Sequence, residues 1–391
     1  MNNQYTRRLE KIEAELNRWL PQEADSTWQT EVFSEKPLPL LEKGAPHLLR
    51  ALTAPGRDLI LRGGKRWRPL LMTLVCESFG GGDAALPLTP LVEFSHNATL
   101  IHDDIEDNSD ERRGKPAVHI VHGVDIAING GSFLYFLSTA CIDSWAASLP
   151  QENRAAAQAY MYSLWAAYIR RIHLGQATDI YWHKNFEAVP TPEEYFSMCA
   201  LKTGCFARFA VEAGMAIGCG KEKSSGALRG CPPLRGGAED AAFAAAEARG
   251  ETSPSLSLLG EAAEKLGIGF QILDDVKNLT AGIPGKKRGD DIVEGKKSLP
   301  VLLFLNRNPG KREAVHRCFN AARAGGVGVP ETEELIQILS AEGVIAEAED
   351  RGKAIIAEAG AIFASFESEG DISAEAAEAR ALLAGLADLL S

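Results

Sequence analysis

The chain has 391 residues, a net charge of −12 at pH 7 and seven cysteines. A chain of this length can bury a large core, and its acidic balance argues against nucleic acid as the main partner. No apolar run reaches the length of a membrane span, and the N-terminus has no apolar signal-peptide core, so we expect no transmembrane segment. The cysteines are never spaced as Cys-x-x-Cys, which is typical of reduced thiols in a cytoplasmic protein, with neither a zinc site nor a disulfide frame.

The N-terminal part carries a helical pattern and then a basic loop. Residues 5–20 place apolar side chains at helical spacing, which predicts an amphipathic helix, and residues 22–40 look irregular. Residues 62–69 read Arg-Gly-Gly-Lys-Arg-Trp-Arg-Pro and precede an apolar run. Its glycines let backbone N–H groups approach an anion, and a helix that starts here adds its positive dipole end. The pattern predicts an anion-binding loop; a basic loop at an ordinary helix start is the alternative.

The most informative stretch follows the apolar run that begins at Leu91. If residues 91–105 are helical, Asp103 and Asp107 are four apart and share a face, with Asp104 about 100° round the helix. Paired carboxylates at this spacing suit a hard cation such as Mg²⁺. Arg112 and Arg113 follow, and the guanidinium fork matches phosphate oxygens. These residues suggest a magnesium–diphosphate site; a solvated acidic helix end followed by a basic loop is the alternative.

The middle of the chain continues the helical pattern. We expect helices at residues 126–148 and 152–183, the second carrying Gln176 and Asp179 on one face as either a buried hydrogen-bonded pair or ligand contacts. Thr191 is expected to be the N-cap of a further helix that carries Lys202 and Thr203. Residues 220–254 are rich in Gly, Pro and Ser, which predicts a flexible insertion within a single domain of residues 1–391.

A second acidic cluster appears far downstream. Asp274 and Asp275 end an apolar helical run in residues 255–280, and the Gly- and Lys-rich loop of residues 285–300 can close over a phosphate. The two acidic clusters could hold metals from opposite walls of one cavity. We find no alternating strand pattern of convincing length, so the predicted fold class is all-α, a many-helix bundle.

Six motifs, in this order, together resemble those of the trans-type isoprenyl diphosphate synthases (polyprenyl synthetases), of the geranylgeranyl or longer-chain type. They are Gly64-Lys-Arg-Trp-Arg-Pro69, Leu100-Ile-His-Asp-Asp-Ile-Glu-Asp107 with Arg112-Arg-Gly-Lys-Pro116, Gly175-Gln-x-x-Asp179, Lys202-Thr203, Phe270-Gln-x-x-Asp-Asp275 and Gly289-x-Asp-x-x-Glu-Gly-Lys296. The resemblance implies an antiparallel helical bundle around a central cavity and a homodimer. It also implies condensation of isopentenyl diphosphate with an allylic diphosphate, of the C5 to C15 range, with release of diphosphate.

The resemblance also assigns roles to residues of this chain. Three Mg²⁺ ions, which Mn²⁺ can replace, are expected on Asp103, Asp107 and Asp274, with Asp104 and Asp275 in support. The allylic diphosphate is expected to bind Arg112, Lys202, Thr203, Gln271, Lys287 and Lys296. Isopentenyl diphosphate is expected to bind Lys65, Arg68, His96 and Arg113. The chain departs from the family at Asn278, where a third aspartate is frequent.

Product length is expected to depend on the helix that carries Asp103. Thr99 and Ala98, four and five residues before it, are small, and bulky residues there limit the family's products to about C15. Phe94 lies nine residues before Asp103, about 13 Å along a helix, and is the expected floor of the cavity; Tyr135 or Phe136 could serve instead. We therefore expect a C20 product, with longer ones open. A class I terpene cyclase and a non-catalytic subunit of a heteromeric synthase are the alternatives.

Overall fold

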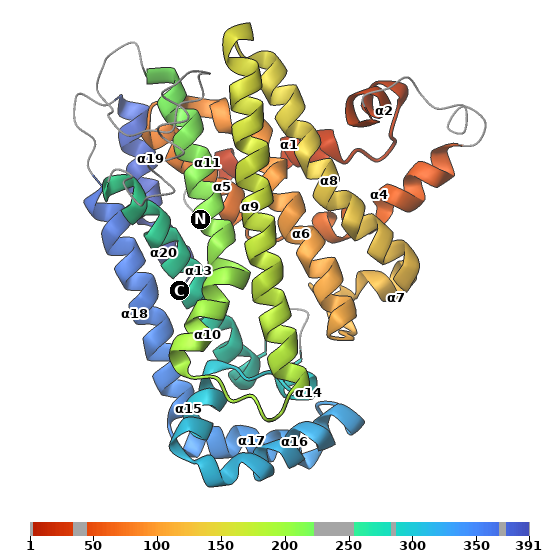
Figure 1. Cartoon of the computed structure of the whole chain (residues 1–391), viewed down its shortest axis with the longest axis vertical. Coiled ribbons are helices and arrows are strands. Elements are labelled where there is room, and N and C mark those ends of the chain that lie inside the picture. Colours follow the sequence, from red (N-terminus) through yellow and green to blue (C-terminus); the bar gives the residue numbers. More distant parts are fainter. Residues whose placement is uncertain (1–2, 34–44, 223–253, 283–286, 367–372, 391) are drawn as a thin grey trace.

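The computed structural model describes residues 3–33, 45–222, 254–282, 287–366 and 373–390. The all-α prediction is confirmed, because the regular elements of the described residues are helices and one hairpin of two two-residue strands (Figure 1). The elements of the first half are α1 (Asn3–Trp19), α2 (Ser26–Phe33), α4 (Ala45–Leu61), α5 (Trp67–Ser78), the 3₁₀ helix η1 (Gly82–Leu88), α6 (Thr89–Glu106), β1 (Glu111–Arg112), β2 (Lys115–Pro116), α7 (Val118–His122), α8 (Val124–Ser148) and α9 (Gln151–Lys184).

The second half begins with α10 (Pro192–Cys199), the π-helix η2 (Ala200–Gly204), α11 (Cys205–Glu222) and α13 (Pro254–Thr280). It ends with α14 (Asp290–Glu294), α15 (Leu299–Arg307), the 3₁₀ helix η3 (Pro309–Lys311), α16 (Arg312–Gly325), α17 (Pro330–Ala341), α18 (Val344–Ser365), α19 (Ala374–Ala384) and α20 (Leu386–Leu390). The flexible insertion predicted at residues 220–254 lies almost entirely outside the described residues.

Most predicted helices are confirmed within a few residues of their expected ends. The prediction of an irregular segment at residues 22–40 is wrong in part, because α2 forms there. Its start is capped by Asp25, whose Oδ1 accepts a hydrogen bond from the backbone N–H of Trp28 at 2.8 Å. The indole N–H of Trp28 donates to the Trp19 carbonyl at 2.9 Å and so ties α2 to the end of α1. These contacts, rather than an apolar stripe, stabilise this short helix.

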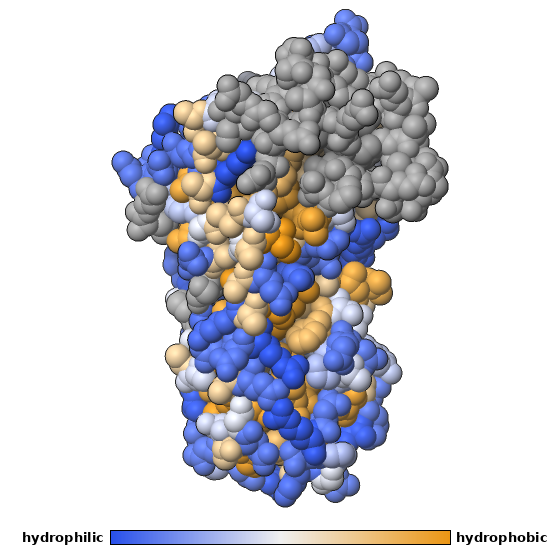
Figure 2. Space-filling view, turned by 90° about the vertical axis from the view of Figure 1, so that its left-hand side faces the viewer, coloured by the Kyte–Doolittle hydropathy of each residue, from blue (hydrophilic) through white to orange (hydrophobic). Residues whose placement is uncertain are grey.

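The long helices α8, α9, α11, α13 and α18 run along the long axis of the molecule, and α15, α16 and α17 lie across its lower end (Figure 1). Helix α5 lies inside the bundle, and all of its residues are buried. One hydrophobic core surrounds it, and a second fills the lower end between α10, α13 and α15–α18. The surface of that lower end is largely hydrophilic, and apolar residues gather nearer the middle of the face seen in Figure 2.

The π-turn η2 is pressed between α9 and α13 at three glycines. A Cβ atom on Gly175 would lie 2.5 Å from the backbone nitrogen of Lys202, and one on Gly267 would lie 2.5 Å from the Cα of Gly204. A Cβ atom on Gly204 would lie 2.8 Å from the carbonyl oxygen of Glu264. These backbones can approach so closely only because the side chains are absent. The contacts fix the position of Lys202 and Thr203 relative to both neighbouring helices.

The structure bears on two expectations, one about transmembrane segments and one about the cysteines. No helix within the described ranges is long and apolar enough to cross a membrane. Five of the cysteines are free and buried: Cys76, Cys141, Cys199, Cys205 and Cys318. Cys219, in contrast, is disulfide-bonded. The expectation of seven reduced thiols is therefore wrong for this residue, because spacing along the chain cannot reveal which thiols the fold brings together.

Candidate active site

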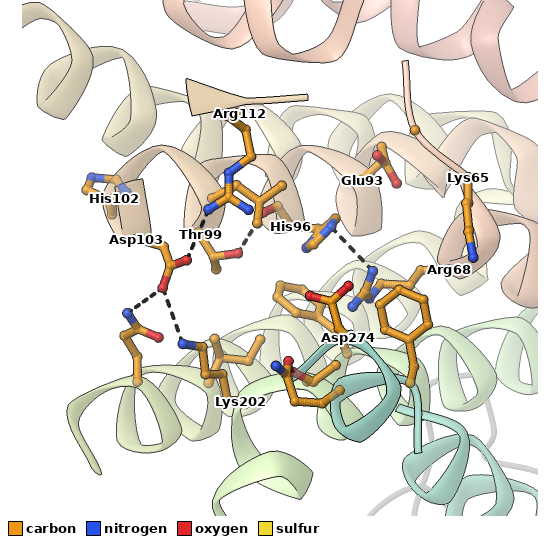
Figure 3. A pocket seen from close by; sticks show the side chains of 18 of the residues that line it. Lys65, Arg68, Glu93, His96, Thr99, His102, Asp103, Arg112, Lys202 and Asp274 are labelled. Carbon is orange, nitrogen blue, oxygen red and sulfur yellow. Dashed lines mark hydrogen bonds and ion pairs between the residues drawn. The ribbon is translucent and has the colours of Figure 1, made fainter. Parts of the chain in front are cut away.

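The helices enclose one cavity of about 610 Å³, shown in Figure 3. Eight basic and four acidic side chains of the described residues line it. This local excess of positive charge contrasts with the net charge of −12 of the whole chain. The apolar part of the wall is formed by Trp67, Leu100, Tyr135, Ile172, Phe206, Phe270 and Leu273. A polyanion attached to a hydrocarbon is the kind of ligand that suits such a lining.

Asp103 lies in the cavity wall at the end of α6. Its carboxylate accepts hydrogen bonds from Arg112 at 3.3 Å, from the Lys202 ammonium at 3.2 Å and from the Gln176 amide at 2.9 Å. Asp104 points the other way, as its place on the helix predicts, and is fully buried. It accepts two hydrogen bonds from Arg112, at 2.7 and 2.5 Å. One guanidinium therefore bridges the two neighbouring carboxylates and offsets their repulsion.

Lys202 joins the first aspartate motif to α9. Its ammonium also donates to Asp179 at 2.6 Å, and the Nε2 of His183 lies 2.7 Å from the other oxygen of Asp179. Burial raises the pKa of Asp179, but the contacts with Lys202 and His183 outweigh it and hold that pKa well below its ordinary value. Gln176 donates a hydrogen bond to Asp103, and Asp179 accepts one from Lys202. Both residues thus contact predicted site residues, and a direct contact with a ligand stays a prediction.

Asp107 caps the C-terminal end of α6 and faces α14 instead of the main cavity. Its carboxylate lies 3.3 Å from the ammonium of Lys296, which also contacts Asp291 at 3.6 Å and forms a close ion pair with Glu294. Burial raises the pKa of Asp107. Lys287 lies beside Asp107 and Asp290 in a smaller depression and does not line the main cavity. The structure thus places Lys296 in the cavity wall and Lys287 outside it.

The other end of the cavity is basic (Figure 3). Arg68 is 7% exposed, its Nη1 lies 3.3 Å from the Nε2 of His96, and its Nε makes no hydrogen bond within the described part of the chain. Burial and the charges of Arg68 and Arg113 lower the pKa of His96 well below its ordinary value, so its imidazole is neutral. Lys65 also lines this end, with its ammonium 5.3 Å from the centre of the Phe270 ring.

Arg113 reaches the same end of the cavity from the hairpin. It adopts a left-handed backbone conformation with φ of 55°. Its Nη1 donates to the Leu59 carbonyl at 3.0 Å and forms a short hydrogen bond with the Gly63 carbonyl. Because the Leu59 carbonyl lies in the last turn of α4 and Gly63 follows that helix, the guanidinium caps the end of α4 while it lines the cavity.

The second acidic cluster lies on α13. Asp274 lines the cavity, whereas Asp275 is 6% exposed and turned away from it. Asp275 accepts hydrogen bonds from the Tyr195 hydroxyl at 2.6 Å and from the Gln271 amide at 2.9 Å, and Gln271 accepts one from Thr203 at 3.0 Å. Burial and the charge of Asp291 raise the pKa of Asp275 to about 7. This chain of contacts links α10, η2 and α13 behind the cavity wall.

Asn278, the departure from the family pattern, is fully buried. Its Oδ1 accepts a hydrogen bond from the backbone N–H of Asp291 at 3.2 Å, and its own carbonyl accepts one from Gly289 at 2.9 Å. Asn278 therefore attaches α14 to α13.

The residues present fit a divalent cation in their chemistry. Asp103 and Asp274 line one cavity from two helices, and the buried Oδ2 of Asp107 lies 3.3 Å from the ammonium of Lys296. In the described part of the chain, no three acidic, histidine or cysteine side chains converge on a single point. Arg112, Lys202 and Lys296 hold the carboxylates. The carboxylates offer only oxygen donors, and lysine and arginine side chains already balance their charge. Mg²⁺ is usually bound by one or two carboxylates together with phosphate oxygens of the substrate, so this arrangement is compatible with Mg²⁺ that binds together with a phosphate group.

The predicted length determinants lie at different depths. Thr99 lines the cavity, whereas Phe94 and Ala98 are fully buried in the core and do not. Tyr135 lines the cavity beyond Thr99 and stacks on His102 with ring centres 5.6 Å apart. Phe94, the floor expected from the sequence, therefore does not line the described cavity, and Tyr135 is the aromatic residue of those considered that does.

Three residues close to the site carry no motif and were missed. Tyr195 lies four residues after Thr191, the N-cap of α10. His183 follows Asp179 by four residues, a spacing that puts these two side chains on one face of α9. Glu93 lies three residues before His96, one turn away on α6, and lines the cavity. Helical spacing from a motif residue is the signal that could have found the last two.

Comparisons with known proteins identify the family of this chain. The model of the polyprenyl synthetase family matches residues 50–230 and 238–334. The chain is 34% identical to a short chain isoprenyl diphosphate synthase of Methanocaldococcus jannaschii over 253 residues, which are 64% of each chain. It is 31% identical to a geranylfarnesyl diphosphate synthase of Aeropyrum pernix over 272 residues, 68% of this chain and 73% of that protein. The match thus spans about two thirds of these relatives.

Solved structures extend the similarity of fold to nearly the whole chain. A geranylgeranyl pyrophosphate synthetase from Pyrococcus horikoshii Ot3 superposes with a TM-score of 0.68 at 24% identity, covering 98% of this chain and 97% of that one. A decaprenyl diphosphate synthase from Rhodobacter capsulatus gives 0.70 at 21% identity, covering 100% and 98%. At these identities the likeness concerns the fold.

Proposed function

Because this chain belongs to the polyprenyl synthetase family, we propose that it is a prenyltransferase that condenses isopentenyl diphosphate with an allylic diphosphate of the C5 to C15 range. The product is a trans-polyprenyl diphosphate of C20, geranylgeranyl diphosphate, or longer, and diphosphate is released. The curated relatives named above support this reaction class, since both are isoprenyl diphosphate synthases.

The observation that carries the proposal is that one cavity holds two separate groups of cationic side chains. Arg112 and Lys202 contact Asp103 at one end, and Lys65 and Arg68 lie at the other, with Asp274 beside Arg68 (Figure 3). Lys296 also lines the cavity and contacts Asp107. Apolar side chains form the wall between them. Two diphosphates bound at these ends would bring their hydrocarbon parts together, which is the positioning that a condensation needs.

The chemistry requires the allylic C–O bond to break while charge develops on the leaving diphosphate. Arg112 and Lys202 are held in place by buried carboxylates, so they can stabilise that charge without first being ordered. Attack by the isopentenyl double bond gives a tertiary cation, which loses a proton from C2 to the released diphosphate. No His/Asp base pair is therefore needed, and Phe206, Phe270 and Leu273 shield the cation from water.

We assign Mg²⁺ to Asp103, Asp107 and Asp274, with three ions expected and Mn²⁺ as a substitute. The metal supplies Lewis-acid stabilisation of the leaving diphosphate when it is bound. Asp104 and Asp275 then support the site without facing the cavity. Asp104 orients Arg112, and Asp275 accepts hydrogen bonds from Tyr195 and Gln271. Lys287 shares the smaller depression with Asp107, so its expected contact is with a phosphate held near that carboxylate.

We also propose a homodimer. Exposed apolar side chains gather on α7 and the following helix: Ile120, Val121, Val124, Ile128 and Phe136. Phe136 is 67% exposed, which is unusual for a side chain of its size. A second copy of the chain that covers this face would remove this apolar surface from water. The single domain and the cytoplasmic location expected from the sequence stay predictions.

The decisive experiment is incubation of the purified chain with Mg²⁺, isopentenyl diphosphate and each of dimethylallyl, geranyl and farnesyl diphosphate. We expect diphosphate release that depends on both substrates, and a product of C20 or longer. Absence of release with every starter would remove the enzyme assignment and favour a non-catalytic subunit. Release without isopentenyl diphosphate would favour a terpene cyclase, the alternative that Lys65, Arg68 and His96 at the second end argue against.

A further inference from the structure

The basic end of the cavity contains one carboxylate that the proposed reaction does not use. Glu93 lines the cavity on α6, three residues before His96, and is only 3% exposed (Figure 3). A buried carboxylate in a diphosphate site is unfavourable for binding, because it repels the ligand and loses its own hydration. The contacts of Glu93 indicate a structural role that compensates for this cost.

Glu93 is fixed by a neutral and a charged donor. The side-chain amide of Asn97 donates to its Oε1 at 2.8 Å, and the Nη1 of Arg66 donates to the same oxygen at 2.8 Å. Asn97 is fully buried one turn further along α6. The orientation of the Glu93 carboxylate is therefore determined from both sides.

Arg66 passes this constraint on to the basic loop. Its backbone is left-handed, with φ of 48°, and its Nη2 donates to the Ile60 carbonyl at 2.6 Å while its Nη1 also reaches the Gly63 carbonyl at 3.3 Å. The side chain thus folds back on the end of α4 and holds the loop in a conformation that a non-glycine residue adopts only with support. Lys65 directly precedes Arg66, and Arg68 follows it by two residues.

Glu93 also balances charge among the remaining cations. Burial lowers the pKa of Arg68 and of Arg113 to about 10, and in both cases the charge of Glu93 opposes that shift. His96 is neutral here, because burial and the neighbouring guanidinium groups lower its pKa, so it does not add to the repulsion. Without Glu93, closely spaced guanidinium groups would face one another before any diphosphate arrives.

We propose that Glu93 is a positioning residue for isopentenyl diphosphate: through Arg66 it holds Lys65 and Arg68 in place, and its charge offsets the repulsion between Arg68 and Arg113. The inference rests on the proposed function. It predicts an asymmetric defect, because the contacts of Glu93 lie at the basic end of the cavity and not among the aspartates. Loss of its charge should weaken binding of isopentenyl diphosphate and leave binding of the allylic substrate unchanged.

The test compares Glu93→Gln with Glu77→Gln. Glu77 is a matched control, since it is 4% exposed and pairs with Arg8 at 2.6 Å, outside the cavity lining. We expect Glu93→Gln to raise the KM for isopentenyl diphosphate about tenfold or more, with the KM for farnesyl diphosphate changed less than about twofold, as the loss of a hydrogen-bonded charge implies. Glu77→Gln should lower the melting temperature and change neither KM.

A double-mutant cycle separates positioning from a direct effect. If Glu93 acts through Arg66, the variant with both Glu93→Gln and Arg66→Gln should be no worse in KM for isopentenyl diphosphate than the poorer single variant. Additive effects would overturn this route, and equal changes in both KM values would overturn the inference as a whole. Should Glu93→Gln not fold, Glu93→Asp must show the same selective rise, at least about threefold. An inactive wild-type chain would instead refute the proposed function.

Discussion

The buried carboxyl group of Asp275 leads to a prediction about stability that is independent of catalysis. Burial, with the charge of Asp291, raises its pKa to about 7, although Tyr195 and Gln271 donate hydrogen bonds to it. We expect Asp275→Asn to be more stable than the wild-type chain in alkaline solution, with an advantage that shrinks as the pH falls. The neutral amide avoids the cost of burying an ionised group.

The size of the effect follows from proton linkage. Between the ordinary pKa of 3.8 and the folded value of about 7, the folded protein holds a proton that the unfolded chain has lost. Wild-type stability therefore falls as the pH rises through this range, by about 4 kcal/mol in all and by about 2.5 kcal/mol between pH 5 and pH 8.5. In the variant, the NH₂ group of the introduced asparagine can face the NH₂ group of Gln271, and this loss of a hydrogen bond lowers the stability of the variant by about 1 kcal/mol at every pH.

Urea unfolding in EDTA, followed by circular dichroism at pH 5 and pH 8.5, measures this difference. The free energy of unfolding of Asp275→Asn relative to wild type should increase by about 2.5 kcal/mol between the two pH values. Glu347→Gln is the control: hydrogen bonds and charges from Arg307 and Arg351 lower the pKa of Glu347, so its charge does not change in this range. A difference between Asp275→Asn and wild type that is the same at both pH values would refute the reasoning.

Three further predictions concern the allylic site, the length of the product and the exposed apolar face of α7 and α8. Lys202→Met should reduce kcat at least about 100-fold and lower the melting temperature in EDTA, since Asp103 and the buried Asp179 lose their shared partner; retained activity would exclude this lysine from the allylic site. Tyr135→Ala should lengthen the product in chromatographic sizing, whereas Phe94→Ala should leave it unchanged, because only the tyrosine lines the cavity. Phe136→Glu should give a monomer in size-exclusion chromatography, while Leu258→Glu, an exposed position on another helix, should not.

The sequence predicted the helices and the meeting of distant motifs because both depend on regular spacing. Asp103, Lys202 and Asp274 lie far apart along the chain, yet all three line one cavity. Their roles in metal and substrate binding stay predictions. Spacing also separated Asp104 from Asp103, which point to different sides of the same helix.

What the sequence could not predict depends on side-chain direction and on irregular backbone. Phe94 has the right distance along α6 to be a floor, but its side chain packs into the core, because nine residues turn the helix to another face. Lys287 belongs to a loop whose path no periodicity describes. The left-handed conformations of Arg66 and Arg113 are supported by tertiary hydrogen bonds to the end of α4, which local sequence does not encode.

The π-turn between α10 and α11 lets the chain hold one extra residue at this point. A π-turn contains one residue more than an α-turn, so α10 and α11 are oriented as in a continuous helix that is one residue shorter. If the turn became α-helical with all its residues kept, α10 and α11 would rotate by about 100° relative to each other. Tyr195 could then keep its place behind Asp275 only if the side chains of α11 lost theirs. We expect deletion of Ala200, which leaves both helices in register, to be tolerated far better than insertion of a residue at this position.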